Sequence, residues 1–346
     1  MATGLDTDKA NEAIKEGYAA LERFGSKRLR NWTIAVVATA AFSIWAIATD
    51  GWDLFFQRVV DALNNGFIYA AMALSLVLIY KATGVINFAQ GNMAMFGTFI
   101  AWVFIYDHGF PIWLGIGLAM LLSAFGGAVI ERIFIRPFDP SNHLAITIVT
   151  LAWFIILGAL ATVIWGADPY AFDTPFPRNS FFDFGGARFF YENLGAWATV
   201  IGVLLLVSLL LRRTKVGLAF RSVSSNLESS RLVGIHIGRT IQFGWALAAA
   251  VGTLAGCLIA HKTFLTPSFM GTVLIYSFAA ATLGGLDSLP GAVVGGVLIG
   301  LAETMIGGYI DPIGSDLALG GALVVIIVVL YVKPTGLFGS KRPERV

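Results

Sequence analysis

Residues 84–97 read GVINFAQGNMAMFG and lie between the apolar runs ALSLVLIY (73–80) and FIAWVFIY (99–106). The stretch brings three carboxamides and three glycines into a strongly apolar background: Asn87, Gln90, Asn92, Gly84, Gly91 and Gly97. Polar side chains inside a membrane-spanning segment need partners, and small residues permit close contact between helices. The stretch therefore predicts either the lining of a pore or a tight seam between helices.

The composition of the chain indicates a membrane protein. The 346 residues are 57% hydrophobic and 13% charged, whereas soluble domains carry about 25% charged residues. Apolar runs of about 20 residues, the length of a bilayer-crossing helix, recur along the sequence. The net charge of +2 is too small to indicate a nucleic-acid partner. We predict an all-α polytopic membrane protein that contacts membrane lipid and binds no nucleic acid.

The apolar windows predict about ten transmembrane helices. They fall at 32–49, 59–80, 85–106, 111–130, 144–165, 195–211, 241–260, 270–286, 290–307 and 317–332. With the N-terminus placed in the cytoplasm, the outer side receives only four of the 23 Lys and Arg residues, namely Arg58, Arg178, Arg188 and Lys262. An excess of positive charge marks the cytoplasmic side of a membrane protein. We therefore expect both the N-terminus and the C-terminus in the cytoplasm.

The sequence divides into a head, an extra helix, a main body and a tail. Residues 1–31 predict a cytoplasmic amphipathic helix on the inner leaflet, with a disordered basic extension as the alternative. Residues 32–57 are expected to form an additional transmembrane helix and its outer loop, residues 58–340 the main transmembrane domain, and residues 341–346 a cytoplasmic tail. The outer loop 166–194 is rich in proline and aromatic residues, which predicts a packed but irregular segment.

On a helix, the polar residues of 84–97 share a face with small residues. The members of this face are spaced by three and four: Thr83, Asn87, Gln90, Ala94, Gly97 and Ala101. We assign Asn87, Gln90 and Asn92 to a candidate translocation pathway, and helix packing alone is an equally good interpretation. Because glycine lowers helix stability, a bend or break that lines a cavity is expected near Gly84, Gly91 or Gly97.

A second glycine-rich stretch, LGGLDSLPGAVVGGVLIGLAE, spans residues 283–303. Its double glycine is suited to ending one helix, and Pro290 to opening the next. Along the second helix a glycine seam continues to Glu303, whose carboxylate is costly within a membrane and therefore favours a place in the translocation pathway. A glutamate that only reaches interfacial water is the alternative. The residues assigned to packing or hinges are Gly284, Gly285, Gly291, Gly296 and Gly300.

The connection RRTKVGLAFRSVSSNLESSRLVGIHIGRT, residues 212–240, is the longest on the expected cytoplasmic side. Residues 219–234 have the spacing of one amphipathic helix, and Gly234 is suited to ending it. Such a helix can insert into a groove on a soluble partner. Binding to anionic lipid is the alternative.

The sequence contains no pattern for chemistry of its own. One cysteine, Cys257, and four scattered histidines give no metal-ligand spacing. No phosphate-binding loop of the form GxxxxGKS or GxxxxGKT occurs, and Glu303 alone does not make an active site. We expect no catalytic residue, no metal and no cofactor bound by this chain.

Four stretches together resemble a known family. GVINFAQG, the connection ending in LVGIH, LGGLDSLPGAVVGGVLIGLAE and the closing VKPTGLFG resemble, in this order and spacing, the permease subunits of branched-chain amino-acid ABC transporters. The likeness covers about residues 58–340 and is greatest to the first of the two paralogous permeases of those systems. It implies that residues 58–340 are an ABC permease transmembrane domain in a bacterial inner membrane.

The resemblance also implies partners. The chain would pair with a second, paralogous permease or with a second copy of itself, beneath an extracytoplasmic solute-binding protein. Two cytoplasmic ABC ATPase subunits would bind the ATP and Mg and would dock on residues 217–234. The implied coupling residues are Gly217, Arg221, Glu228, Arg231 and Gly234, and the implied solute is a branched-chain or other neutral amino acid.

Differences from the family's motifs widen the choice of solute. Gln90 and Asn92 stand where the family often has His and Glu, and residues 224–226 replace an expected acidic pair. Urea, an amide, or an aromatic or other carboxylic acid are therefore alternative solutes. An autonomous small-solute channel is a further alternative, which does not account for the 212–240 connection.

Overall fold

The computed structural model describes residues 7–139, 142–309 and 335–339, together with Gly320, Leu323, Val324, Ile327, Tyr331 and Lys333, and it describes side chains from residue 39 onward. The chain divides into two compact units, Met1–Phe56 and Gln57–Val346. The expected tail and most of the expected span 317–332 lie outside the described residues.

The first helix, α1 (Thr7–Thr83), contains one break in its backbone, at Gly51, where φ is 81° and ψ is 167°. Within the first unit, the head and the first expected span belong to one helix, with no break between them in the described range. The amphipathic character of residues 1–31 concerns side chains outside the described residues, and it stays a prediction.

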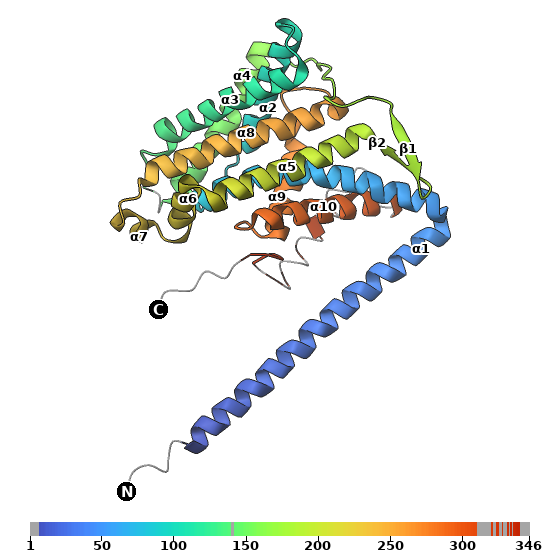
Figure 1. Ribbon diagram of the computed structural model, residues 1–346, viewed down its shortest axis with the longest axis vertical. Coiled ribbons are helices and arrows are strands. Elements are labelled where there is room, and N and C mark those ends of the chain that lie inside the picture. Colours follow the sequence, from blue (N-terminus) through green and yellow to red (C-terminus); the bar gives the residue numbers. More distant parts are fainter. Residues whose placement is uncertain are drawn as a thin grey trace. The chain divides into compact units, whose positions relative to one another are not determined.

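The second unit is a bundle of helices with one small sheet (Figure 1). After α1, its elements are α2 (Gln90–Trp102), the π-helical turn η1 (Val103–Asp107), α3 (Ile112–Ile130), the π-helical turn η2 (Glu131–Ile135), α4 (His143–Trp165), β1 (Phe181–Phe184), β2 (Ala187–Phe190), α5 (Tyr191–Arg213), α6 (Lys215–Ser225), α7 (Leu227–Leu232), α8 (Ile237–Thr263), α9 (Met270–Gly284) and α10 (Leu289–Tyr309). Among the described residues, six helices are long and apolar enough to cross a membrane. The protein is therefore a mostly helical, multi-pass membrane protein.

Side-chain caps set the start of several helices. Asn142 accepts a hydrogen bond from the backbone of Ala145 at the start of α4, and Thr214 accepts one from Gly217 at the start of α6. Such caps satisfy backbone N–H groups that have no partner within the helix. At the opposite end, Gly285 follows α9 with a φ of 106°, a conformation that glycine adopts without steric cost.

α8 lies at the centre of the bundle, alongside α2 and α3 (Figure 1). In its most apolar window 78% of the residues are buried, whereas the corresponding windows of α3, α4 and α5 are each 22% buried. Large apolar side chains on those three helices are exposed, among them Phe125, Ile155 and Leu205. We infer that α3, α4 and α5 face lipid and that α8 is enclosed by protein.

The expectation of an irregular loop at 166–194 is wrong in its second half. β1 pairs with β2 in an antiparallel hairpin, with Phe181 opposite Phe190. The two-residue turn is Gly185-Gly186, and both have positive φ (62° and 90°), which matches the twist of the strands. Phe182 and Phe189 stack across the hairpin with their ring centroids 5.4 Å apart.

α10 packs closely on two neighbours through glycines on different faces. A Cβ on Gly295 would lie 2.1 Å from the carbonyl oxygen of Ala280 in α9. A Cβ on Gly300 would lie 2.4 Å from the backbone nitrogen of Gly66 in α1. Since real Cβ atoms do not approach so closely, only glycine permits these backbone contacts.

We predict that Gly300→Ala lowers the free energy of unfolding by about 1–3 kcal/mol, because the added methyl group overpacks the α1–α10 contact. The matched control is Gly202→Ala in α5, where nothing lies within 4 Å of the added atom. The control should be neutral or slightly stabilising. Thermal unfolding of the two variants in detergent measures the difference, and equal melting temperatures would contradict the packing argument.

Candidate functional site

The stretch 84–97 is not one helix. α1 ends at Thr83, residues 84–89 are irregular, and α2 begins at Gln90. Gly84, with φ of 73°, accompanies the end of α1, and the Asn87 side chain accepts a hydrogen bond from the backbone of Ala89 just before α2. A break is therefore present near Gly84, and its expected place beside a cavity stays a prediction. The expected single helical face is wrong for Thr83 and Asn87, because the positive φ at Gly84 ends the helix before the face can continue.

Asn87 and Gln90 are joined by a side-chain hydrogen bond inside the bundle. Nδ2 of Asn87 donates to Oε1 of Gln90 at 3.0 Å, and Nε2 of Gln90 donates to the carbonyl oxygen of Ala248 in α8 at 2.9 Å. Both residues are buried, at 1% and 0% exposure. In this conformation the two amides join the start of α2 to the middle of α8.

The small residues of α2 that follow also face α8. A Cβ on Gly97 would lie 2.0 Å from Oγ1 of Thr253, and a Cβ on Gly256 would lie 2.2 Å from Oγ1 of Thr98. Asn92 points elsewhere, because its Nδ2 donates to the carbonyl oxygen of Phe154 in α4. The polar stretch therefore makes a seam with α8 and a separate contact with α4.

Glu303 lies one turn beyond the glycine contacts of α10 and bonds to α1. Its Oε2 accepts hydrogen bonds from the Tyr69 hydroxyl at 3.1 Å and from Nδ2 of Asn65 at 3.4 Å. The Tyr69 ring stacks on Tyr276 of α9, with centroids 4.8 Å apart. Glu303 is half-buried. A carboxylate held by two neutral donors at this position joins α1, α9 and α10 in one polar cluster.

The partners of Glu303 were not found by sequence reasoning. Asn65 and Tyr69 are more than 230 positions away in sequence, at separations of 238 and 234. Their spacing of four residues places both side chains on one face of a helix, which the sequence alone shows. The sequence does not show that this face meets Glu303 of α10. The glycines predicted to serve packing or a hinge each have other atoms close to the position of an added Cβ, and their role stays a prediction: Gly84, Gly91, Gly97, Gly284, Gly285, Gly291, Gly296 and Gly300.

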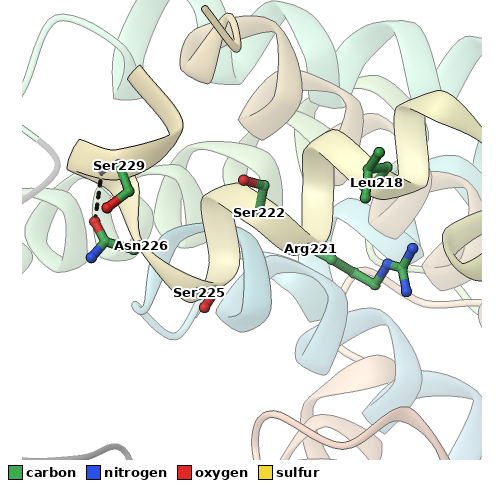
Figure 2. Close-up of a pocket in the computed structure, with 6 residues that line it drawn as sticks. All are labelled: Leu218, Arg221, Ser222, Ser225, Asn226 and Ser229. Atoms are coloured by element: carbon green, nitrogen blue, oxygen red, sulfur yellow. Dashed lines mark hydrogen bonds between the residues drawn. The ribbon is translucent and has the colours of Figure 1, made fainter. Parts of the chain in front are cut away.

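The connection 212–240 forms two helices and not the expected single helix at 219–234. Asn226 adopts an extended conformation, ends α6 and caps α7 through a hydrogen bond from the backbone nitrogen of Ser229 to its Oδ1, at 2.9 Å (Figure 2). Ser222 and Ser230 join the two helices through their hydroxyl groups at 2.9 Å. Gly234 follows α7 with a φ of 82°, as expected for a residue that ends it.

α6 is attached firmly to the bundle on one side. Phe220 is fully buried and lies against Gly244 of α8, where a Cβ would be 2.8 Å from the Phe220 ring. Gly217 is buried against the end of α5, and a Cβ there would lie 2.4 Å from the carbonyl oxygen of Leu211. This side of the connection is part of the protein core.

The other side of the connection is exposed. Leu218, Leu232 and Val233 are 60%, 88% and 73% exposed. A depression of about 440 Å³ lies on this side. Figure 2 shows the residues that line it: Leu218, Arg221, Ser222, Ser225, Asn226 and Ser229. Arg221, Glu228 and Arg231 are also exposed. An apolar and charged surface on a short helical connection is suited to contact with another protein.

The described residues contain no group of three His, Cys, Asp or Glu side chains that could hold a metal ion. The features of this chain are a membrane-spanning bundle, buried amide contacts and a half-buried carboxylate contact between helices, and an exposed two-helix connection. Together they define a membrane transport subunit.

Comparison with known proteins places this subunit in a family. Residues 58–332 match the family model described as branched-chain amino acid transport system / permease component. The chain belongs to this family, which confirms the resemblance found in the sequence. It is a membrane-spanning permease subunit of an ABC importer and is not an enzyme.

The chain matches its relatives over nearly their whole length. The chain is 27% identical to the high-affinity branched-chain amino acid transport system permease protein LivH of Escherichia coli, over 84% of this chain and 98% of the relative. It is 30% identical to a probable branched-chain amino acid transport permease protein LivH of Methanocaldococcus jannaschii, over 80% and 91%. Among solved structures, PsaBC from Streptococcus pneumoniae in complex with Fab is 13% identical, with a TM-score of 0.44 over 86% of this chain and 97% of that chain.

We predict that Gln90→Leu lowers the free energy of unfolding by about 1–3 kcal/mol, because it leaves the buried Asn87 amide without its acceptor. Asn87→Leu removes the other partner of this bond. The double variant should therefore lose less stability than the sum of the two single variants. Thermal unfolding of all three variants in detergent measures the coupling, and additive losses would show that the bond is absent.

Proposed function

We propose that this chain imports branched-chain or other neutral amino acids across a bacterial inner membrane. It pairs with a second, paralogous permease, two cytoplasmic ABC ATPase subunits and an extracytoplasmic solute-binding protein. The names of the two LivH relatives support the solute class. Residues 58–340 form the transmembrane domain in this proposal, and residues 32–57 supply an additional helix.

The orientation follows from charge. We propose ten spans with both termini in the cytoplasm, which puts α6 and α7 on the cytoplasmic side together with most of the lysine and arginine. The short α2 and α9 then cross the bilayer with the help of η1 and of the connections beside them. The observation that favours this arrangement is that α6 and α7 contain Arg221 and Arg231 next to exposed apolar side chains.

The observation that best supports ATP-driven import is the exposed side of α6 and α7. One side of this connection is buried in the bundle through Gly217 and Phe220, and the other presents Leu218 and Leu232 to the cytoplasm. An element that is fixed to the bundle and free on its outer side can pass the movement of a docked ATPase to the membrane helices. Arg221, Glu228 and Arg231 supply the charges for that contact, and Gly234 sets the end of α7.

The translocation pathway is proposed to involve Glu303, Asn87, Gln90 and Asn92. The polar cluster of Glu303, Tyr69 and Asn65 is half-buried and offers a carboxylate oxygen to a passing solute. Asn87 and Gln90 are closed into the α2–α8 contact in this conformation, so they reach the pathway only when that contact opens. Neutral amino acids carry an ammonium group, which a carboxylate attracts.

We predict that Glu228→Ala combined with Arg231→Ala reduces solute-stimulated ATP hydrolysis by about tenfold or more, since charges at an interface contribute to docking. The assay uses the complete complex in proteoliposomes, with binding protein and solute. Arg132→Ala is the matched control, because Arg132 is exposed outside the α6–α7 connection. Unchanged stimulation in the double variant would contradict the docking assignment.

We predict that Glu303→Gln lowers uptake of a neutral amino acid while the ATPase subunits still co-purify with the chain. The physical reason is that glutamine keeps the shape and the contacts to Tyr69 but loses the negative charge. Tyr69→Phe removes one donor and keeps the charge, so its effect on uptake should be smaller. Uptake of labelled leucine, with urea and benzoate as comparison solutes, tests both the residue and the solute class.

A further inference from the structure

An ion pair at the end of α3 holds an arginine against the start of α8. Nε of Arg136 donates to Oε1 of Glu131 at 3.2 Å, and its Nη2 donates to Oε2 at 2.6 Å. The Glu131 side chain is 1% exposed and that of Arg136 is 31% exposed. A guanidinium that binds both oxygens of a carboxylate is held in one orientation. The pair therefore points the Arg136 guanidinium in a defined direction.

That direction is the first turn of α8. Nη2 of Arg136 also lies within hydrogen-bonding distance of two acceptors there, the carbonyl oxygen of Gly238 and Oε1 of Gln242, each at 2.9 Å, and its two hydrogens are shared among these and Glu131. Gly238 has no Cβ, and an added one would lie 3.2 Å from Nε of Arg136. In the opposite direction, Nε2 of Gln242 donates to the carbonyl oxygen of Ala128 in α3 at 3.0 Å. We call Glu131, Arg136, Gly238 and Gln242 the clamp.

The clamp lies where the cytoplasmic connection becomes a membrane helix. α7 ends at Leu232, Gly234 turns the chain, and α8 begins at Ile237. Two turns into α8, Gly244 receives the Phe220 ring of α6. The first turns of α8 are therefore in contact with α6 on one side and bonded to η2 and α3 on the other.

We propose that Arg136 is a positioning residue that passes movement of α6 and α7 to α3. This proposal rests on the proposed function, because it requires an ATPase docked on the connection. Charge-assisted hydrogen bonds from one guanidinium to η2 and to α8 keep the two elements at a fixed separation. α8 therefore cannot shift at its start without carrying the end of α3 with it.

A contact that serves stability alone does not need an ion pair. Replacement of a buried ion pair by neutral side chains of similar volume is often neutral or stabilising, whereas removal of one partner leaves a buried charge without its counter-ion. Stability and positioning can therefore be separated by comparing a single with a paired substitution. A structural role is restored by the paired change, and a positioning role is not.

The test uses the complete complex of permeases, ATPases and binding protein in proteoliposomes. Arg136→Gln is compared with Glu131→Gln combined with Arg136→Gln, with Arg136→Lys, and with the control Arg132→Gln, which lies beside Glu131 in η2. For each variant we measure thermal unfolding, co-purification of the ATPase, basal ATP hydrolysis and solute uptake per ATP hydrolysed.

We expect the single variant to lose thermal stability and the paired variant to recover it. Both should keep the ATPase bound and keep basal hydrolysis, while solute uptake per ATP falls by about tenfold. Arg136→Lys should restore part of the uptake, since lysine keeps the charge and one donor direction. The Arg132 control should behave like the unaltered complex.

Uptake per ATP that equals that of the unaltered complex in the paired variant would overturn the proposal. If no Arg136 variant assembles, Gln242→Ala removes the side-chain acceptor on α8 and the bond to Ala128, while the ion pair and the bond to Gly238 remain. Uptake per ATP should fall in that variant, and normal uptake per ATP would likewise overturn the proposal. Failure of the proposed function gives a different result, because an unaltered chain that binds no ATPase shows no solute-stimulated hydrolysis to lose.

Discussion

The close approach of α2 to α8 is the constraint on which the bundle depends. Positions 252 and 256 of α8 leave no space for a Cβ, which would lie 2.7 Å from Nε2 of Gln90 at the first and 2.2 Å from Oγ1 of Thr98 at the second. Lipid tails are as apolar as leucine, so burial of apolar surface adds little to helix association in a bilayer, and close packing and internal hydrogen bonds must hold the contact. The bond from Gln90 to the carbonyl oxygen of Ala248 fixes the register of this contact. α3 and α6 then pack on the same central helix.

The polar residues of the membrane region differ in the partners that they find. A polar side chain that stays within the bilayer needs a partner from the protein. Asn87 and Gln90 find theirs in each other and in α8, and Asn92 finds one in α4. Glu303 is different, because its charge is held by neutral donors from Asn65 and Tyr69. The amides thus join helices, while the carboxylate keeps a charge that the described partners do not neutralise.

Local chemistry explains which parts of the fold were predictable. Gly84, Gly285 and Gly234 end helices where the sequence places glycine after an apolar or amphipathic run. The helices α3, α4, α5, α8, α9 and α10 each overlie a predicted apolar window. The break at Asn226 was missed although Asn226 precedes Leu227 and Glu228, a sequence typical of a helix start. The hairpin was missed although a double glycine separates two aromatic runs. The partners of Glu303 and the clamp were out of reach, because they join positions more than 100 apart, and local spacing contains no information on such pairs.

Close contacts group the helices of the second unit into two sets, and this grouping determines which helices move together. α2, α3 and α8 are joined by the Gln90 bond, by the glycines at 97, 127, 252 and 256 and by the clamp. α10 is joined to α1 and α9 by Gly295, Gly300 and the Glu303 cluster. Packed interfaces of this kind have discrete arrangements and do not deform continuously. As long as the α2–α8 contact stays closed, displacement of α8 at its start moves the first set as one body, because each of its contacts is too close to slip. The relative movement then falls on the contacts between the two sets, and these contacts include Gly91 of α2 against Leu274 of α9.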